Sequence, residues 1–254
     1  MSFEVRAEAY GRFMGRYSEP LAGRFATFAG VVPGRRALDV GCGTGALTSE
    51  LVERMGAEAV SAIDPSDAFV AATRIRFPGV DVRRASAERL PFSEEVFDFT
   101  LAQLVVHFMQ DPVAGLHDMA RVTRPGGVVA ACVWDHAGGR GPLTVFWHAV
   151  LDLDPHAHDE SQLAGAREGH LTELFVAAGL RDIESTMLTV QTRFRTFEEW
   201  WEPFTLGVGP AGDYVRGLDT ERRLELRDRC ASLLPQQGPV DVTASAWATI
   251  GRTP

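Results

Sequence analysis

Three glycines, Gly41, Gly43 and Gly45, have the spacing in this sequence that points most directly to ligand binding. They follow an apolar stretch over 36–40 and open a stretch over 45–55 whose apolar residues recur at helical spacing. Glycines between a buried strand and a helix permit a tight turn, and they let a ligand approach main-chain N–H groups. The loop therefore predicts a ligand site, with a glycine turn that binds nothing as the alternative.

Two acids near this loop distinguish two kinds of ligand. Asp64 stands about 20 residues beyond the glycines, as the ribose-binding acid does when Gly41-x-Gly43-x-x-Ala46 is a dinucleotide fingerprint. Asp39 lies within the apolar stretch, where an ionised carboxylate is costly unless it accepts hydrogen bonds. We expect Asp39 to brace the loop or to receive a ligand ammonium through water. Because a pyrophosphate disfavours a nearby negative charge, Asp39 favours an amino-bearing ligand over NAD(P).

Five ordered stretches resemble the motifs of class I S-adenosylmethionine-dependent methyltransferases, and most closely those of the ubiquinone/menaquinone-type small-molecule group. The similarity covers roughly residues 34–135. Its stretches are Leu38-Asp39-Val40-Gly41-Cys42-Gly43-Thr44-Gly45, Ala62-Ile63-Asp64-Pro65-Ser66, Ala85-Ser86-Ala87-Glu88-Arg89-Leu90-Pro91-Phe92, Phe97-Asp98-Phe99 with Ala102-Gln103-Leu104, and Met119-Ala120-Arg121-Val122-Thr123-Arg124-Pro125-Gly126-Gly127.

The resemblance implies S-adenosylmethionine as cofactor, S-adenosylhomocysteine as product, and a set of cofactor-binding residues. Asp64 should accept both ribose hydroxyls, and Gln103 should face the sulfonium region. Ser86 departs from the Asp that is usual in the family, so its bond to the adenine amino group would be neutral and weaker. The full set is Tyr10, Arg16, Asp39, Gly41, Cys42, Gly43, Thr44, Gly45, Asp64, Pro65, Ser66, Ser86, Ala87, Glu88, Gln103 and Leu104.

Tyr10 and Arg16 belong to this set because the stretch 10–17 is placed to close over the cofactor carboxylate. The alternative for both residues is an amphipathic cap helix with a solvated arginine.

Methyl transfer from a sulfonium requires mainly alignment of the reacting atoms, and a base is needed only if the acceptor must lose a proton. His107 is the first catalytic candidate, because it follows the fourth predicted strand at the edge where ligands bind such sheets. A core histidine is the alternative. His136 is the second candidate, with Asp135 available to orient it, and a solvated loop is its alternative.

Two further groups of residues could contribute to a site. Five aromatic residues would form a wall suited to an apolar or aromatic acceptor, unless they pack between helices: Trp147, Phe197, Trp200, Trp201 and Phe204. Five polar residues stand close together in one loop, which is more typical of a solvated turn than of a metal site: Asp154, His156, His158, Asp159 and Glu160. We predict no metal.

These residues require a sheet to position them. Apolar strands predicted over 36–40, 59–63, 80–84, 97–104 and 128–134 alternate with helices, which indicates a parallel, doubly wound α/β sheet. The stretches 183–194 and 242–250 alternate apolar and polar residues, as antiparallel edge strands do. We therefore predict one methyltransferase domain with a seven-stranded Rossmann-like sheet. Its core is 31–195 and 239–254, its N-terminal helical cap 1–30, and its helical lid 196–238, inserted between the last two strands.

Composition limits the partners. All 25 basic residues are arginine, against 34 acidic ones, so the net charge of −9 argues against nucleic acid or an anionic membrane surface. The absence of lysine excludes Schiff-base and P-loop lysine chemistry. The three cysteines form no C-x-x-C unit, and no apolar run reaches the roughly 20 residues of a membrane span. We expect a cytoplasmic protein.

The predicted function is methyl transfer to a small molecule, with homodimer formation left open. The alternatives are an NAD(P)-dependent oxidoreductase and a non-catalytic regulatory protein that binds S-adenosylmethionine.

Overall fold

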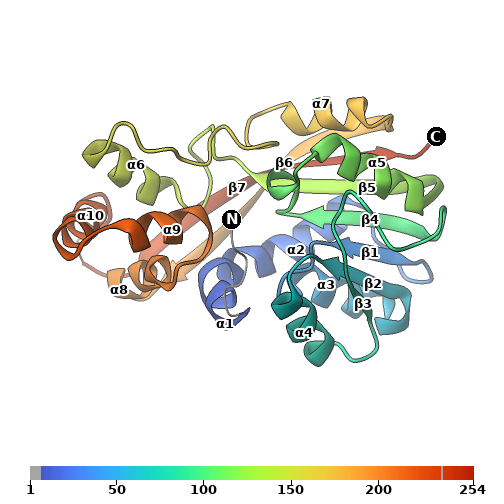
Figure 1. The fold of residues 1–254 in the computed structure, drawn as a ribbon, viewed down its shortest axis with the longest axis horizontal. Coiled ribbons are helices and arrows are strands. Elements are labelled where there is room, and N and C mark those ends of the chain that lie inside the picture. The colour runs from blue at the N-terminus through green and yellow to red at the C-terminus, as the bar shows by residue number, and fades with distance from the viewer. Residues whose placement is uncertain (1–6, 236) are drawn as a thin grey trace.

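A seven-stranded sheet in the order β3-β2-β1-β4-β5-β7-β6 forms the centre of the computed structural model, which describes residues 7–235 and 237–254 (Figure 1). Strands β1 to β5 pair in parallel, and β7 runs antiparallel to both of its neighbours. The predicted fold is confirmed. The strands are β1 (Ala37–Val40), β2 (Val60–Asp64), β3 (Asp81–Arg84), β4 (Phe97–Gln103), β5 (Thr123–Trp134), β6 (Arg181–Phe194) and β7 (Val240–Arg252).

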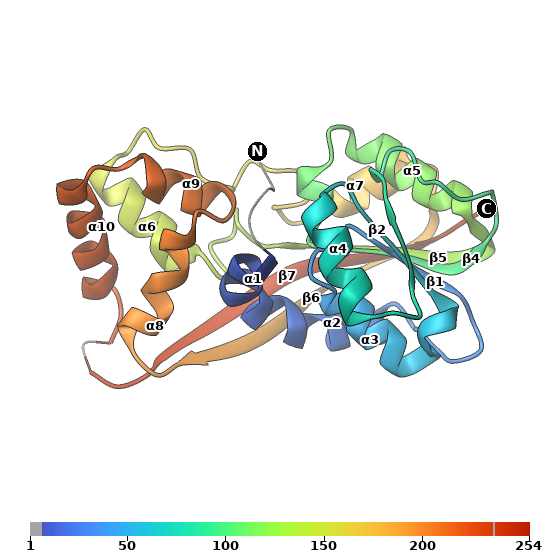
Figure 2. The same ribbon diagram turned by 60° about the horizontal axis from the view of Figure 1, so that its bottom comes forward.

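Helices cover both faces of this sheet (Figures 1 and 2). Helices α2 (Arg16–Phe28) and α3 (Ala46–Met55) contribute to one buried apolar cluster, and α5 (Pro112–Val122) and α7 (His170–Ala177) to a second. Local signals fix where helices begin. Asp111 caps α5 by accepting from the N–H of Ala114, and Ser66 accepts from the N–H of Phe69 at the start of α4 (Asp67–Arg76).

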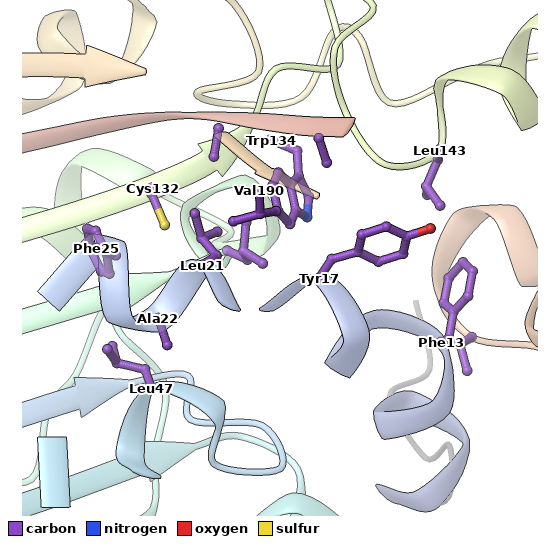
Figure 3. Packing of buried hydrophobic residues seen from close by; sticks show 14 of the residues in the cluster. Phe13, Tyr17, Leu21, Ala22, Phe25, Leu47, Cys132, Trp134, Leu143 and Val190 are labelled. Atoms are coloured by element: carbon purple, nitrogen blue, oxygen red, sulfur yellow. The ribbon is translucent and has the colours of Figure 1, made fainter. Parts of the chain in front are cut away.

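The predicted N-terminal helical cap forms one nearly continuous helical stretch. It comprises α1 (Ala7–Tyr10), the π-helical turn η1 (Gly11–Gly15) and α2; residues 1–6, which also belong to the predicted cap, lie outside the described residues. Leu21 points from α2 toward Val190 and Trp134 of the sheet, whereas Tyr17 points toward the side where Leu143 and Phe13 lie (Figure 3). The Tyr17 ring lies 6.5 Å from that of Trp134 on β5, so the cap packs directly beside the end of this strand.

Strand β5 begins at Thr123, earlier than the predicted 128. Thr123 pairs with Phe97 of β4, and its hydroxyl lies 2.6 Å from that of Thr100 in a buried bond. This polar pair anchors the start of the strand, although the residues that follow it read as a turn.

A helical lobe lies at the far end of the β6–β7 hairpin (Figures 1 and 2). It contains α6 (Thr144–Leu153), α8 (Phe197–Trp201), η4 (Glu202–Leu206), α9 (Gly209–Gly217) and α10 (Thr220–Ser232). The predicted lid supplies all of these except α6, which the sequence placed in the core. The Phe146 ring of α6 stacks on Phe204 with centroids 4.6 Å apart, which ties α6 to the lobe.

The remaining helical turns are η2 (Ala57–Ala59) before β2 and η3 (Val106–Phe108) after β4. Within the described residues, no helix combines the length and apolar character that crossing a membrane requires.

Candidate cofactor and acceptor site

The glycine loop after β1 takes backbone conformations that side chains disfavour. Gly41, Gly43 and Gly45 have φ angles of +74°, +54° and +87°. The N–H groups of Gly41 and Cys42 both donate to the carbonyl of Ile63 on β2, at 2.8 and 2.9 Å. A Cβ at Gly41 would lie 2.5 Å from Val105 Cγ2, whereas one at Gly43 would meet only Tyr10, at 3.8 Å. The loop is therefore packed at Gly41 and open at Gly43.

Asp39 braces this loop from within the sheet. Its carboxylate accepts a 2.6 Å hydrogen bond from the Thr48 hydroxyl on α3. Burial raises the pKa of Asp39 to about 7, against the lowering effect of the Thr48 bond, and the negative charge of Asp64 raises it further. The acid thus joins the strand to the helix that follows the loop, as one of its two predicted roles requires.

Asp64 holds the glycine loop at its other side. Its two carboxylate oxygens accept from the N–H groups of Gly43 at 2.9 Å and Ser66 at 2.8 Å. The residue is 6% exposed, and burial raises its pKa despite these two bonds. Each carboxylate oxygen can accept more than one hydrogen bond, so ribose hydroxyls could be added without loss of the loop contacts.

A cleft beside these residues, which we name the cofactor cleft, encloses about 1020 Å³ including space open to solvent. It contains five of the predicted cofactor residues, Gly41, Pro65, Ser86, Ala87 and Glu88. Glu88 accepts from the backbone N–H of Gln110, which holds the far wall in place. The other lining residues are Val40, Ile63, Val105, Phe108, Met109, Gln110, Asp111 and Ala114.

A second, narrower and more enclosed space, which we name the acceptor cavity, lies between the cap, the sheet edge and the lobe. Its volume of about 490 Å³ includes space open to solvent, and only about 40 Å³ of it admits the centre of a water molecule. Phe108 lines both spaces, so they are neighbours across η3. The predicted residues Tyr10, Leu104, His107 and His136 line the cavity, and the others are Phe13, Met14, Phe108, Trp134, Leu143, Glu160, Val208, Gly209, Pro210 and Ala211.

The two candidate histidines meet at this cavity, with ring centroids 6.3 Å apart. Burial and the nearby His136 lower the pKa of His107 to about 3. Burial also lowers the pKa of His136, although Glu160, Asp159 and Asp135 act in the opposite direction. His107 Nδ1, His136 Nε2 and Trp134 Nε1 are buried and have no hydrogen-bond partner among the residues that the structure describes. The cavity therefore holds neutral imidazoles with unused hydrogen-bonding capacity.

Gln103 at the end of β4 is the corresponding polar group near the cap. Its Nε2 donates to the Ser18 carbonyl on α2 at 2.8 Å, while Oε1 is buried with no partner in the described part of the chain. Cys42 and Thr44 contribute differently: Cys42 Sγ faces the Thr73 hydroxyl at 3.9 Å, and the Thr44 carbonyl accepts from Arg76. The Cys42 side chain and the Thr44 carbonyl thus stabilise the loop from behind.

Several predicted contacts are made elsewhere. Arg16 pairs with Glu199 of α8 and does not line the cofactor cleft. Asp135 bonds to Arg140, the N–H of Gly138 and Trp247 Nε1, so its partners are not the His136 ring.

None of the five aromatic residues expected to form a wall lines the cavity; they pack between the helices of the lobe, which was the alternative for them: Trp147, Phe197, Trp200, Trp201 and Phe204. The loop residues 154–160 bring no metal-binding group together in the described ranges.

Among the contributors to the acceptor cavity, sequence reasoning did not name Phe108 or Trp134, and it favoured a solvated turn for the loop that holds Glu160. Phe108 directly follows the candidate His107, so the end of β4 carried a signal for it. Trp134 ends β5 at the same edge of the sheet. Glu160 lies in an irregular loop, where no periodicity marks a buried acid; only the tertiary structure shows that it is 5% exposed and that it lines the cavity.

The sheet order, the antiparallel β7 and the glycine loop after β1 define the Rossmann-like fold of class I methyltransferases. Residues 38–131 match the family model described as "Methyltransferase domain". The predicted resemblance to class I S-adenosylmethionine-dependent methyltransferases is confirmed over this stretch, which holds the glycine loop, Asp64 and all the residues that line the cofactor cleft.

Curated relatives are similar over part of their length. The chain is 40% identical over 128 residues to a demethylmenaquinone methyltransferase of Mycobacterium sp. (strain KMS), covering 50% of this chain and 53% of that protein. It is 35% identical over 159 residues to a ubiquinone biosynthesis O-methyltransferase of Rhizobium johnstonii, covering 60% and 62%. The matched region thus spans between half and two thirds of these relatives.

A solved structure shares the fold across nearly the whole chain. It is a phosphoethanolamine N-methyltransferase 2 of Haemonchus contortus in complex with phosphomonomethylethanolamine and S-adenosylhomocysteine. The TM-score is 0.60 at 17% identity, covering 98% of this chain and 57% of that one.

Proposed function

We propose that this protein transfers a methyl group from S-adenosylmethionine to a small apolar or aromatic molecule and releases S-adenosylhomocysteine. The observation that supports this most strongly is the adjacency of two spaces that share Phe108. The open cleft borders the family's cofactor motifs, whereas the enclosed cavity is lined mainly by apolar side chains. A transferase needs this pairing of a donor site with an acceptor site.

The chain's residues fit the cofactor. Gly43 leaves its loop open, Asp64 retains acceptor capacity for ribose hydroxyls, and Gln103 Oε1 is a buried acceptor without a partner in the described chain. Pro65 and the stretch 86–88 would hold the adenine within the cleft. When bound, S-adenosylmethionine supplies a methyl group already activated by its positively charged sulfur.

The residues of the acceptor cavity would then orient the acceptor and exclude water, rather than take part in covalent chemistry. Apolar walls exclude water, and orientation of the reactants contributes much of the rate in such transfers. The neutral imidazoles of His107 and His136 can accept a hydrogen bond from the acceptor. A pKa of about 3 makes His107 a weak proton acceptor, so a role as a base requires that the bound acceptor raise this pKa. Tyr10 separates the acceptor cavity from the open side of Gly43.

Two other functions are weaker alternatives. An NAD(P)-dependent oxidoreductase is disfavoured by the buried Asp39 at the end of β1, since its carboxylate would oppose a pyrophosphate. A regulatory protein that only binds the cofactor would not need an enclosed cavity beside the cleft.

Calorimetry with S-adenosylmethionine, S-adenosylhomocysteine, NADH and NADPH tests the cofactor assignment. We expect saturable binding of the two adenosyl compounds and none of the nicotinamides. Turnover is then tested with cofactor carrying a labelled methyl group and a panel of aromatic hydroxyl compounds and aromatic amines. Nicotinamide binding without a response to the adenosyl compounds would overturn the proposal.

A further inference from the structure

Glu160 is an acid buried at the acceptor cavity without a matching positive charge. It is 5% exposed, and in the described residues its carboxylate receives a single side-chain hydrogen bond, from Trp147 Nε1 at 2.9 Å. No arginine of residues 7–235 and 237–254 forms an ion pair with it. Buried charges are normally paired, because desolvation of an isolated ion is costly. A positively charged group on a ligand could therefore supply the partner that this carboxylate lacks.

The groups around Glu160 do not replace that partner. His136 lines the same cavity, and burial favours its neutral form. The Trp147 indole is a neutral donor, and it orients one carboxylate oxygen without balancing the charge. The cavity thus has a carboxyl group on one wall with no positively charged side chain of the described residues paired to it.

Aromatic rings form much of the remaining wall, namely Tyr10, Phe13, Phe108 and Trp134. The faces of such rings attract cations, most strongly where water is excluded. A carboxylate together with several aromatic rings in a small cavity is the combination that recognises an ammonium group on an apolar body. A neutral hydroxyl could donate to Glu160, but it would leave the charge unbalanced.

We propose that the acceptor carries a basic amine that enters as an ammonium ion, and that Glu160 is the residue that selects it. The ammonium group serves recognition; if its nitrogen is also the atom methylated, its proton must first pass to a base, and the neutral His136 imidazole lines the same cavity. This inference rests on the proposed function, since it names the class of molecule that enters the acceptor cavity. Glu160, Trp134, His136 and the lobe residues 208–211 all lie outside the matched region 38–131. The acceptor preference is therefore carried by this chain's own cavity.

The test compares two probes of nearly equal shape, 2-phenylethylamine and 2-phenylethanol, on protein saturated with S-adenosylhomocysteine. Calorimetry and tryptophan fluorescence measure binding, because Trp134 lines the cavity and Trp147 contacts Glu160. We expect the amine to bind about tenfold or more tightly than the alcohol. Glu160→Gln keeps the shape and the acceptor for Trp147, and it should reduce that preference to less than about twofold.

Two control variants complete the experiment. Glu168→Gln makes the same chemical change at an exposed acid eight positions along the chain, and it should keep the preference. Glu160→Asp retains the charge and should keep part of it. Equal affinity of the two probes for the wild type, binding of neither, or an undiminished preference in Glu160→Gln would overturn the inference. Failure of S-adenosylhomocysteine to bind would instead contradict the proposed function, so the two failures are distinguishable.

Discussion

Arg16 of the cap donates a 2.5 Å hydrogen bond to the Glu199 carboxylate of α8, and its guanidinium lies 4.9 Å from the Phe194 ring centroid at the end of β6. The pair joins two segments 183 residues apart in the sequence. Because Tyr10 and Phe13 of the cap region line the acceptor cavity, the contact also fixes one wall of that cavity against the lobe.

Removal of this contact should loosen the cap. We predict that Glu199→Gln lowers the melting temperature and increases proteolysis near the N-terminus, because Arg16 and Arg195 both lose their charged partner. Hydrogen bonds from Arg16 and Arg195 hold the pKa of Glu199 at about 2. A depressed pKa means that the stabilisation is present above the ordinary value of 4.5 and is lost as the pH falls toward 2.

Thermal melts of the wild type and the variant between pH 2 and 7 check this. The melting curves should differ at pH 7 and converge near pH 2. Glu202→Gln is the control, since its pair with Arg12 is more exposed and should matter less. Equal effects of the two variants would show that the Arg16 pair has no special role.

Gly41→Ala should destabilise the glycine loop through a steric clash as well as through its φ angle. The added Cβ would lie 2.5 Å from Val105 Cγ2. Gly34→Ala is a matched control, because Gly34 has φ +76° and nothing within 4 Å. Both variants incur about 1 kcal/mol of backbone strain. We predict an additional cost of about 1–3 kcal/mol for Gly41→Ala in urea unfolding.

The clash makes a second outcome predictable. Gly41→Ala combined with Val105→Ala should recover part of the additional cost, because the obstructing methyl groups are gone. If Gly41→Ala and Gly34→Ala have equal free energies of unfolding, packing against Val105 is not the reason that position 41 requires glycine.

The cofactor half of the site could be read from the sequence because its signals are local. Asp39, Gly41 and Asp64 lie at the ends of β1 and β2, and the parallel pairing of these strands brings the three residues together. An acid in an otherwise apolar strand, as Asp39 is, can be recognised from the sequence alone. The acceptor half depends on long-range packing. Glu160 lies in an irregular loop with no periodic pattern. Trp200 packs into the lobe because Phe146 of α6 joins the same aromatic cluster, and no local sequence pattern predicts that contact.

Asp39 should make the folded protein less stable as the pH rises toward 7. Its pKa is raised from 3.8 to about 7 by burial, so the folded state binds a proton that the unfolded state releases. The associated stability is complete below about pH 4 and is lost as the pH rises through 7. Asn cannot ionise, so Asp39→Asn should remove up to about 4 kcal/mol of the change in the free energy of unfolding that occurs as the pH rises.

Urea unfolding at several pH values between 4 and 8 measures this slope. The variant curve should be flatter than that of the wild type over this window. Parallel curves would mean that Asp39 stays ionised in the folded protein throughout.

Asp64→Ala should weaken the binding of S-adenosylhomocysteine by roughly ten- to a hundredfold, since each hydrogen bond to a charged acceptor contributes about 1.5–3 kcal/mol. The variant also frees the N–H of Gly43, so Asp64→Asn is needed beside it. The amide oxygen can still accept one bond, and its affinity should lie between those of wild type and Asp64→Ala. Calorimetry gives the constants. Unchanged affinity in a folded Asp64→Ala protein would remove this residue from the site.

His107 carries the riskiest prediction. With its pKa lowered to about 3, its imidazole is neutral throughout the usual assay range, so it should produce no limb near pH 6.5 in the rate profile. For a hydroxyl acceptor, His107→Ala should reduce turnover by about 10²–10⁴-fold and leave cofactor affinity nearly intact. For an activated carbon, or an amine that has already lost its proton, alignment suffices and the loss should be far smaller; an ammonium acceptor must lose a proton, as a hydroxyl does. His107→Gln retains a hydrogen-bond acceptor but no basic nitrogen, so it separates positioning from proton transfer. A higher turnover in His107→Gln than in His107→Ala indicates positioning.

Rates across pH 5–9 for the acceptor found in the labelled-methyl screen provide the measurement. A His107→Ala protein with a normal rate and an unchanged profile would show that the residue is structural, and His136, across the same cavity at a ring distance of 6.3 Å, would then be the residue to change.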